Sequence, residues 1–114
     1  MAAGKPGSDF LGADLEKIEE RHPAWYRDYF HLQELQRPDP SEATRIWAVK
    51  EALLKALGLG LMADPMDIRT DGKAAFTGKA LERYKELGSP PFSVETRPFP
   101  EGFWTAVVAD NARK

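Results

Sequence analysis

The stretch from residue 39 to residue 60 constrains the fold of this chain more than any other part. Asp39-Pro40-Ser41-Glu42 places a capping aspartate before a proline at the first helical position, and the glutamate stands where a capping box needs it. Gly58 and Gly60 then supply a left-handed stop after about Leu57. The sequence therefore predicts a single helix of about five turns between these boundaries.

This predicted helix is apolar around most of its circumference. At 100° per residue, aliphatic side chains and one indole cover most of its surface: Ala43, Ile46, Trp47, Ala48, Val49, Ala52, Leu53, Leu54, Ala56 and Leu57. A helix of this kind is buried on several sides, so its few polar side chains are the informative ones. Thr44, Glu51 and Lys55 share a narrow polar stripe, whereas Lys50 projects from the middle of the apolar face.

Shorter elements flank this helix. Apolar patterning, prolines and glycines predict a strand over 10–16, helices over 23–36 and 78–87, and hairpins that pair 66–69 with 74–76 around Asp71-Gly72 and 92–97 with 103–109. Short strands around a long helix predict an α+β fold, with a short antiparallel sheet packed against the long central helix.

The size and composition of the chain indicate one ordinary globular domain. The chain has 114 residues and a net charge of −2, and we expect a flexible lead-in over residues 1–9 and a single domain over 10–114. The absence of cysteine excludes disulfides and thiolate metal sites, and the balanced charge does not favour a nucleic-acid partner. No apolar run is long enough for a membrane span, so we expect a cytoplasmic protein without a membrane partner.

Carboxylates and lysines can form a site where the first strand meets the long helix. Asp14 and Glu16 lie on one face of the predicted strand, and Glu51 joins them if the helix packs on that face. Three carboxylates at one point repel each other unless a cation or a proton intervenes. Oxygen ligands of this kind suit Mg²⁺, and Lys50 and Lys55 would supply positive charge to the same phosphates.

The same residues also have ordinary structural explanations. Asp-x-Glu pairs are common on solvated strand faces, and Glu51 and Lys55 are spaced for a helical ion pair. Lys50 can extend its stem along apolar surface to reach water. We interpret His22 and His31 as surface histidines, because neither has a partner at ligand spacing. Composition and spacing alone leave both interpretations open.

Two segments together resemble the signature motifs of the 4′-phosphopantetheinyl transferase superfamily. The segment 12–18, Gly-Ala-Asp-Leu-Glu-Lys-Ile, is similar to G-[IV]-D-x-[ED], and the segment 47–55, which begins at Trp47, is similar to [WF]-x-x-K-E-[AS]-x-x-K. The segment 30–35 resembles the linker motif F-[ST]-x-x-E-x, and Gly58-Leu59-Gly60 matches the G-x-G that follows the helix. The resemblance covers about residues 10–109 and implies a phosphopantetheinyl transferase-like fold.

The resemblance implies a Mg²⁺-dependent transfer of 4′-phosphopantetheine from coenzyme A to a serine of an acyl or peptidyl carrier protein, as in fatty acid or polyketide biosynthesis. By matching positions, Asp14, Glu16 and Glu51 would bind the metal. Lys50 and Lys55 would contact the pyrophosphate of coenzyme A, and Glu51 or a metal-bound water would deprotonate the serine. The segment 25–35 lies where members of this family receive the carrier protein.

A departure from the family pattern leaves an alternative open. Small members of the family resemble homotrimers and carry a Ser-x-Ser-His motif near the last hairpin, whereas the segment 92–97 contains no histidine. Asp14-x-Glu16 and Trp47 instead resemble the second half of the two-lobed, surfactin-synthetase-activating type. We expect a homo-oligomer, a trimer by resemblance, or a partner domain. The alternative is a non-catalytic carrier-docking or assembly domain of a larger synthase.

Overall fold

The computed structural model describes residues 9–35, 39–59, 63–70, 74–99 and 102–110 of the chain. Most of the predicted lead-in, the predicted stop at Gly60 and the predicted turn at Asp71-Gly72 lie outside these ranges. No helix in the described part of the chain has the length and the apolar character that a membrane span needs.

The main sheet has three antiparallel strands. Strand β1 (Asp9–Lys17) lies at one edge, β5 (Phe103–Asp110) in the middle and β4 (Phe92–Phe99) at the other edge. In the register of β1 with β5, Asp14 lies opposite Ala106 and Glu16 opposite Trp104. The strand predicted over 10–16 and the last predicted hairpin are both confirmed, with each strand slightly longer than predicted.

Helix α2 (Pro40–Leu57) has the predicted boundaries. The Asp39 side chain accepts a hydrogen bond from the backbone N–H of Ser41, and Gly58 ends the helix in the left-handed conformation at φ 75°. The Glu42 side chain pairs with Arg45 one turn further along the helix. Capping chemistry written into the sequence therefore sets both ends of α2.

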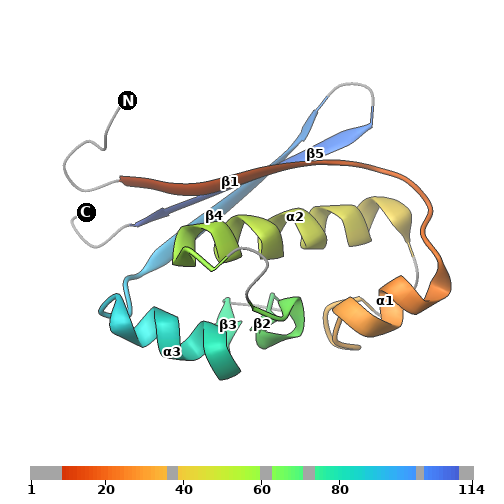
Figure 1. Cartoon of the computed structure of the whole chain (residues 1–114). Coiled ribbons are helices and arrows are strands. Elements are labelled where there is room, and N and C mark those ends of the chain that lie inside the picture. The colour runs from red at the N-terminus through yellow and green to blue at the C-terminus, as the bar shows by residue number, and fades with distance from the viewer. Residues whose placement is uncertain (1–8, 36–38, 60–62, 71–73, 100–101, 111–114) are drawn as a thin grey trace.

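Helix α2 lies between two layers of the molecule, as Figure 1 shows. It packs against β1 and β5 on one side, and the layer on the other side is formed by α1, η2, the short hairpin and α3. The bounds of this second layer are α1 Pro23–Tyr29, the 3₁₀ helix η2 Pro65–Asp67, β2 Ile68–Arg69, β3 Ala75–Phe76 and α3 Gly78–Glu86. Burial on both sides explains why α2 is apolar around most of its circumference.

The core of the protein is centred on α2. The larger cluster joins α2 to the middle strand, the short hairpin and α3: Ala48, Val49, Ala52, Leu53, Leu54, Leu57, Ile68, Ala80, Ala106 and Val108. The smaller cluster joins the first half of α2 to α1 and is built around Phe30, Ala43 and Ile46. These contacts confirm the predicted α+β fold with a long central helix.

The first helix is shorter than predicted. The sequence predicts a helix over 23–36, but α1 ends at Tyr29 and Phe30 is extended, with φ −132° and ψ 140°. The extended backbone directs the Phe30 ring into the smaller core cluster. The Trp25 ring packs against Phe30, and the Trp47 ring packs against Trp25. The aromatic residues of this segment therefore pack in or against the core. The burial of Phe30 ends the helix at Tyr29, although the apolar pattern in the sequence continues beyond that residue.

Gly12 brings β1 and α2 into backbone contact. A Cβ at this position would lie 2.4 Å from the carbonyl oxygen of Ala52 and 2.8 Å from the backbone nitrogen of Ala56. Only a residue without a side chain permits this approach. Because side chains alternate along a strand, Asp14 and Glu16 lie on the same face of β1 as Gly12 and are directed toward α2.

Replacing Gly12 by alanine should therefore force α2 away from the sheet. We expect Gly12→Ala to lower the free energy of unfolding by about 2 kcal/mol or more, because helix backbone cannot give way as a flexible side chain can. Urea unfolding followed by circular dichroism measures the loss. Ala13→Ser, which adds one heavy atom on the opposite face of β1, is the control and should change stability by less than about 0.5 kcal/mol. Equal effects of the two substitutions would contradict the packing described.

Candidate active site

Asp14 is a largely buried carboxylate where β1 meets α2. Its side chain is 9% exposed, and its Oδ1 accepts a hydrogen bond from Lys55 Nζ at 2.8 Å. Lys55 also donates to the backbone carbonyl of Ala13 at 3.2 Å. The other oxygen of Asp14, Oδ2, is buried and has no hydrogen-bond partner in the part of the chain that the structure describes. Leu15 is turned the other way and is 53% exposed, which confirms the predicted alternation.

Glu16 and Glu51 share this environment with Asp14. Burial raises the pKa of Glu16 to about 8, assisted by the adjacent Asp14 carboxyl and by the negative charge of Glu51. Burial also raises the pKa of Glu51, and the charge of Asp14 adds to this effect while Lys55 opposes it. We call Asp14, Glu16, Glu51 and Lys55 the acidic group, since each side chain influences the ionisation of another.

The acidic group has oxygen donors suited to a magnesium ion. No set of three or more His, Cys, Asp or Glu side chains among the described residues has an arrangement that could hold a metal. Mg²⁺ usually binds through one or two carboxylates and completes its shell with water and substrate phosphates. The unpartnered Oδ2 of Asp14 and the adjacent Glu16 carboxyl fit that requirement. The predicted role of Glu51 as a third ligand stays a prediction.

Lys50 does not lie in the acidic group. Its ammonium is fully buried and donates to Glu34 Oε1 at 2.8 Å, to the carbonyl oxygen of Tyr29 at 2.8 Å and to that of Pro65 at 3.3 Å. Burial lowers the pKa of Lys50, and the Glu34 carboxylate opposes that effect. In this structure Lys50 and Lys55 therefore do not share a phosphate site, because Lys50 is bonded to Tyr29 of α1 and Pro65 of η2.

Glu34 has a buried side chain, and its pairing with Lys50 is not predicted by the sequence. Besides Lys50, it accepts hydrogen bonds from the Thr70 backbone N–H at 2.7 Å and hydroxyl at 2.9 Å, and from the His31 backbone N–H at 2.9 Å. His31 Nε2 is bonded to the carbonyl oxygen of Met66 at 2.8 Å and is half-buried, so its prediction as a surface histidine was wrong. The place of Glu34 in the segment that resembles the linker motif is the one indication in the sequence that this residue has a specific role.

Arg21 is a second residue that the sequence did not reveal. Its positive charge reaches Glu16 and opposes part of the rise in the pKa of that carboxyl. The guanidinium lies over the Trp25 ring, 4.5 Å from its centre, and pairs with Glu19 at 3.5 Å. A cation therefore lies at the border of the acidic group, brought there by the turn between β1 and α1.

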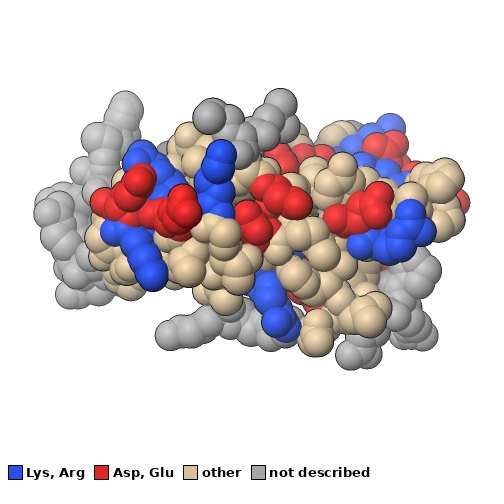
Figure 2. Space-filling model, turned by 60° about the horizontal axis from the view of Figure 1, so that its bottom comes forward, with Lys and Arg blue, Asp and Glu red and all other residues tan. Residues whose placement is uncertain are grey.

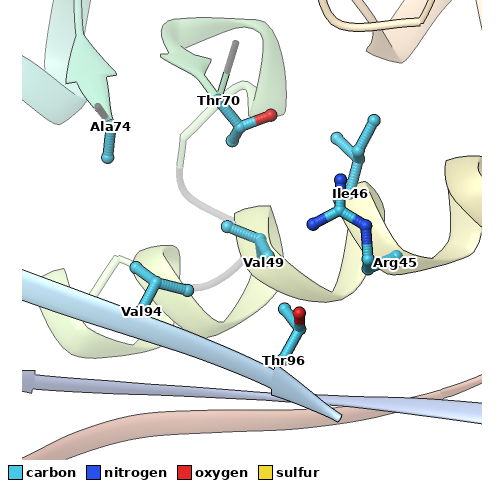
Figure 3. A pocket seen from close by; sticks show the side chains of 7 residues that line it. All are labelled: Arg45, Ile46, Val49, Thr70, Ala74, Val94 and Thr96. Carbon is cyan, nitrogen blue, oxygen red and sulfur yellow. The ribbon is translucent and has the colours of Figure 1, made fainter. Parts of the chain in front are cut away.

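A pocket of about 190 Å³ lies between α2, strand β4 and the short hairpin (Figure 3). It is lined by Arg45, Ile46, Val49, Thr70, Ala74, Val94 and Thr96. The Arg45 guanidinium is paired with Glu42, so the cation in this pocket already has a partner. Strand β5 lies between β4 and β1 in the sheet, and the pocket is therefore separate from the acidic group.

The layer of α1, η2 and α3 presents both signs of charge. Figure 2 shows acidic and basic side chains interspersed on this face, without an extended region of one sign among the described residues. Some of them are paired with each other, as Arg27 is with Asp28 and Arg83 with Glu86.

A family model and several solved structures match this chain. The model of the 4′-phosphopantetheinyl transferase superfamily matches residues 10–108. The chain belongs to this superfamily. The match spans the acidic group, the Glu34–Lys50 pair and the last hairpin, and it confirms the family and the class of enzyme that the two motifs predict. Comparison with curated proteins gave no match.

Solved structures of holo-[acyl-carrier-protein] synthases have the same fold. The synthase of Helicobacter pylori in complex with coenzyme A is 21% identical, with a TM-score of 0.65 over 85% of this chain and 96% of that one. The synthase of Neisseria meningitidis is 22% identical, with a TM-score of 0.64 over 91% and 96%. That of Plasmodium yoelii is 17% identical, with a TM-score of 0.67 over 91% and 96%. These likenesses confirm the predicted fold class.

The raised pKa of Glu16 predicts how stability depends on pH in this transferase-family domain. Between the ordinary value of 4.5 and about 8, the native state holds a proton on Glu16 that the unfolded state releases. The free energy of unfolding of the metal-free protein should therefore fall as the pH rises through that range. Urea unfolding in the presence of a chelator, at intervals of about one pH unit, measures the slope. Glu16→Gln should flatten the slope and Glu82→Gln, on the exposed side of α3, should not; an unchanged slope in Glu16→Gln would contradict the assignment.

Removing one partner of the Glu34–Lys50 pair should strongly destabilise the protein. We expect Lys50→Met to cost about 3 kcal/mol, because it leaves the Glu34 carboxylate buried without its counter-charge. The double variant Lys50→Met/Glu34→Gln should cost clearly less than the sum of the single variants. Urea unfolding measures the cycle, with Lys85→Met on α3 as an exposed control. Additive costs would show that the two side chains do not interact.

Proposed function

We propose that this chain transfers 4′-phosphopantetheine from coenzyme A to a serine of an acyl or peptidyl carrier protein, in a reaction that requires Mg²⁺. The observation that carries the proposal is the acidic group, in which Asp14 and Glu16 of β1 lie beside Glu51 and Lys55 of α2. These residues lie in the two segments that resemble the signature motifs of the superfamily, to which the chain belongs.

The reaction defines what such a site must do. The serine hydroxyl forms a new bond to the phosphorus that carries the pantetheine arm, and the bond from that phosphorus to the oxygen bridging the diphosphate breaks. The serine loses its proton, and adenosine 3′,5′-bisphosphate leaves with the bridging oxygen. Catalysis of phosphoryl transfer depends on neutralising charge on the leaving group and on holding the nucleophile in line.

The residues of the acidic group match these requirements. Asp14 and Glu16 would hold a magnesium ion, which supplies positive charge to the diphosphate when it is bound. Burial raises the pKa of Glu51, which makes this carboxylate a better acceptor for the serine proton at neutral pH. Lys55 is 49% exposed on a flexible stem and can reach a phosphate. We assign the phosphate contact to Lys55 rather than to Lys50, whose hydrogen bonds are all directed into the core.

The open face of the sheet supports the proposal of an oligomer. In the described part of the chain, no helix lies on the face of the sheet that is turned away from α2 (Figure 1). Leu15, Phe99 and Val107 are exposed, and their strand positions place all three on that face. Further copies of this chain, a trimer by the family resemblance, or a partner domain would cover these apolar side chains.

A direct assay tests the proposed function. The protein is incubated with Mg²⁺, coenzyme A and an apo carrier protein, and we expect mass spectrometry to detect a carrier that has gained one phosphopantetheine. Glu51→Gln should lower the rate by at least about a hundredfold, because it removes the proton acceptor. Glu82→Gln on α3 is the control and should keep the full rate. A folded protein that modifies none of several carriers would instead favour the non-catalytic docking domain.

A further inference from the structure

Lys55 already provides a positive charge to the acidic group before any metal binds. Its ammonium lies 2.8 Å from Oδ1 of Asp14, and it makes a second hydrogen bond to the carbonyl oxygen of Ala13. These bonds hold the ammonium against the oxygen that lies beside the unpartnered Oδ2 of the same carboxylate. A cation bound to Asp14 would therefore lie close to the Lys55 ammonium.

Two cations bound to one carboxylate repel each other. A magnesium ion binds carboxylate oxygen at about 2.0–2.1 Å, so an ion on Oδ2 and the ammonium on Oδ1 would lie within about 6 Å of each other. Repulsion between charges at that separation is substantial in a partly buried environment. One of the two must move, and a divalent ion has the stronger attraction to a pair of carboxylates.

The surroundings of Lys55 allow it to be the one that moves. Its side chain is half-exposed, and both of its hydrogen-bond acceptors belong to β1, at the border of the solvent. Lys50 offers the contrast within the same helix, because its ammonium is fully buried and bonded to three acceptors in the core. A long flexible stem lets the Lys55 ammonium leave Asp14 at little cost.

We propose that Lys55 is a resident counter-ion of Asp14, which a divalent cation displaces when it binds. The inference rests on the proposed function because it takes the acidic group as the metal site. It adds a second role for Lys55: the lysine neutralises Asp14 in the metal-free protein, and its release frees a cation for a phosphate oxygen. Removing Lys55 should therefore tighten the binding of the metal, whereas a lysine that serves only as a phosphate ligand should leave metal binding unchanged.

The affinity for Mn²⁺ tests this inference without coenzyme A or a carrier protein. The full chain is titrated with Mn²⁺, and free ion is measured by electron paramagnetic resonance. We expect Lys55→Met to bind Mn²⁺ about three- to tenfold more tightly than the wild type, the gain expected from removing one partly exposed charged hydrogen bond. Lys55→Arg, which retains the charge, should stay close to the wild type. Equal or weaker binding by Lys55→Met would overturn the inference.

Matched variants separate displacement from a general effect of charge. Lys85→Met on α3 makes the same change in net charge far from the site in the fold and should alter the affinity by less than about twofold. Arg21→Met removes a charge that reaches Glu16 without a bond to Asp14, and its effect should be smaller than that of Lys55→Met. An equal effect of Arg21→Met would show that only the field matters and would overturn the inference. In a Lys55→Met/Asp14→Asn double variant the gain should disappear, and a gain that persists would place the ion elsewhere and overturn it as well.

Failure of this inference can be distinguished from failure of the proposed function. A wild type that modifies a carrier protein, together with no gain in Mn²⁺ affinity for Lys55→Met, would overturn the counter-ion role alone. A gain in Mn²⁺ affinity together with no transfer to any carrier would overturn the transferase activity and support displacement of Lys55.

Discussion

The close contact of α2 with β1 at Gly12 determines the rest of the structure. Because no side chain separates the strand from the helix backbone there, the face of β1 that carries Asp14 and Glu16 is held against α2. Burial then makes ionisation of Glu16 and Glu51 costly and raises the pKa of both carboxyls. A packing requirement at one glycine therefore creates the electrostatic environment of the acidic group.

The two motif lysines on α2 have different tasks because the helix lies between two layers. Lys55 comes five positions after Lys50, which places the two about 140° apart around the helix axis. Lys50 is bonded to Glu34 and joins α2 to the layer of α1 and η2. Lys55 is bonded to Asp14 at the border of the sheet. One of the lysines stabilises the fold, and we propose that the other supplies charge to the site.

Local patterns in the sequence predict most of the fold and the shared strand face of Asp14 and Glu16. Capping residues set the ends of α2, and alternation along β1 placed Asp14 and Glu16 together. The sequence did not predict contacts between residues that lie far apart in the chain. Glu34 accepts a hydrogen bond from Thr70, which lies 36 positions further along the chain. The burial of Phe30 ends α1 before the end of the apolar pattern that predicts the helix. The sequence marks Lys50 as a charged residue on an apolar helix face, but it does not identify Glu34 as its partner, because that contact depends on how the layers pack.

The position of a bound divalent ion is the most direct test of whether Asp14 and Glu16 form the metal site. In a crystal grown with Mn²⁺ and coenzyme A, anomalous scattering locates the ion independently of the rest of the density. We predict an anomalous peak within bonding distance of Asp14 and Glu16, with the Lys55 ammonium no longer bonded to Asp14. A peak at another surface of the molecule, or none beside these carboxylates, would contradict this prediction.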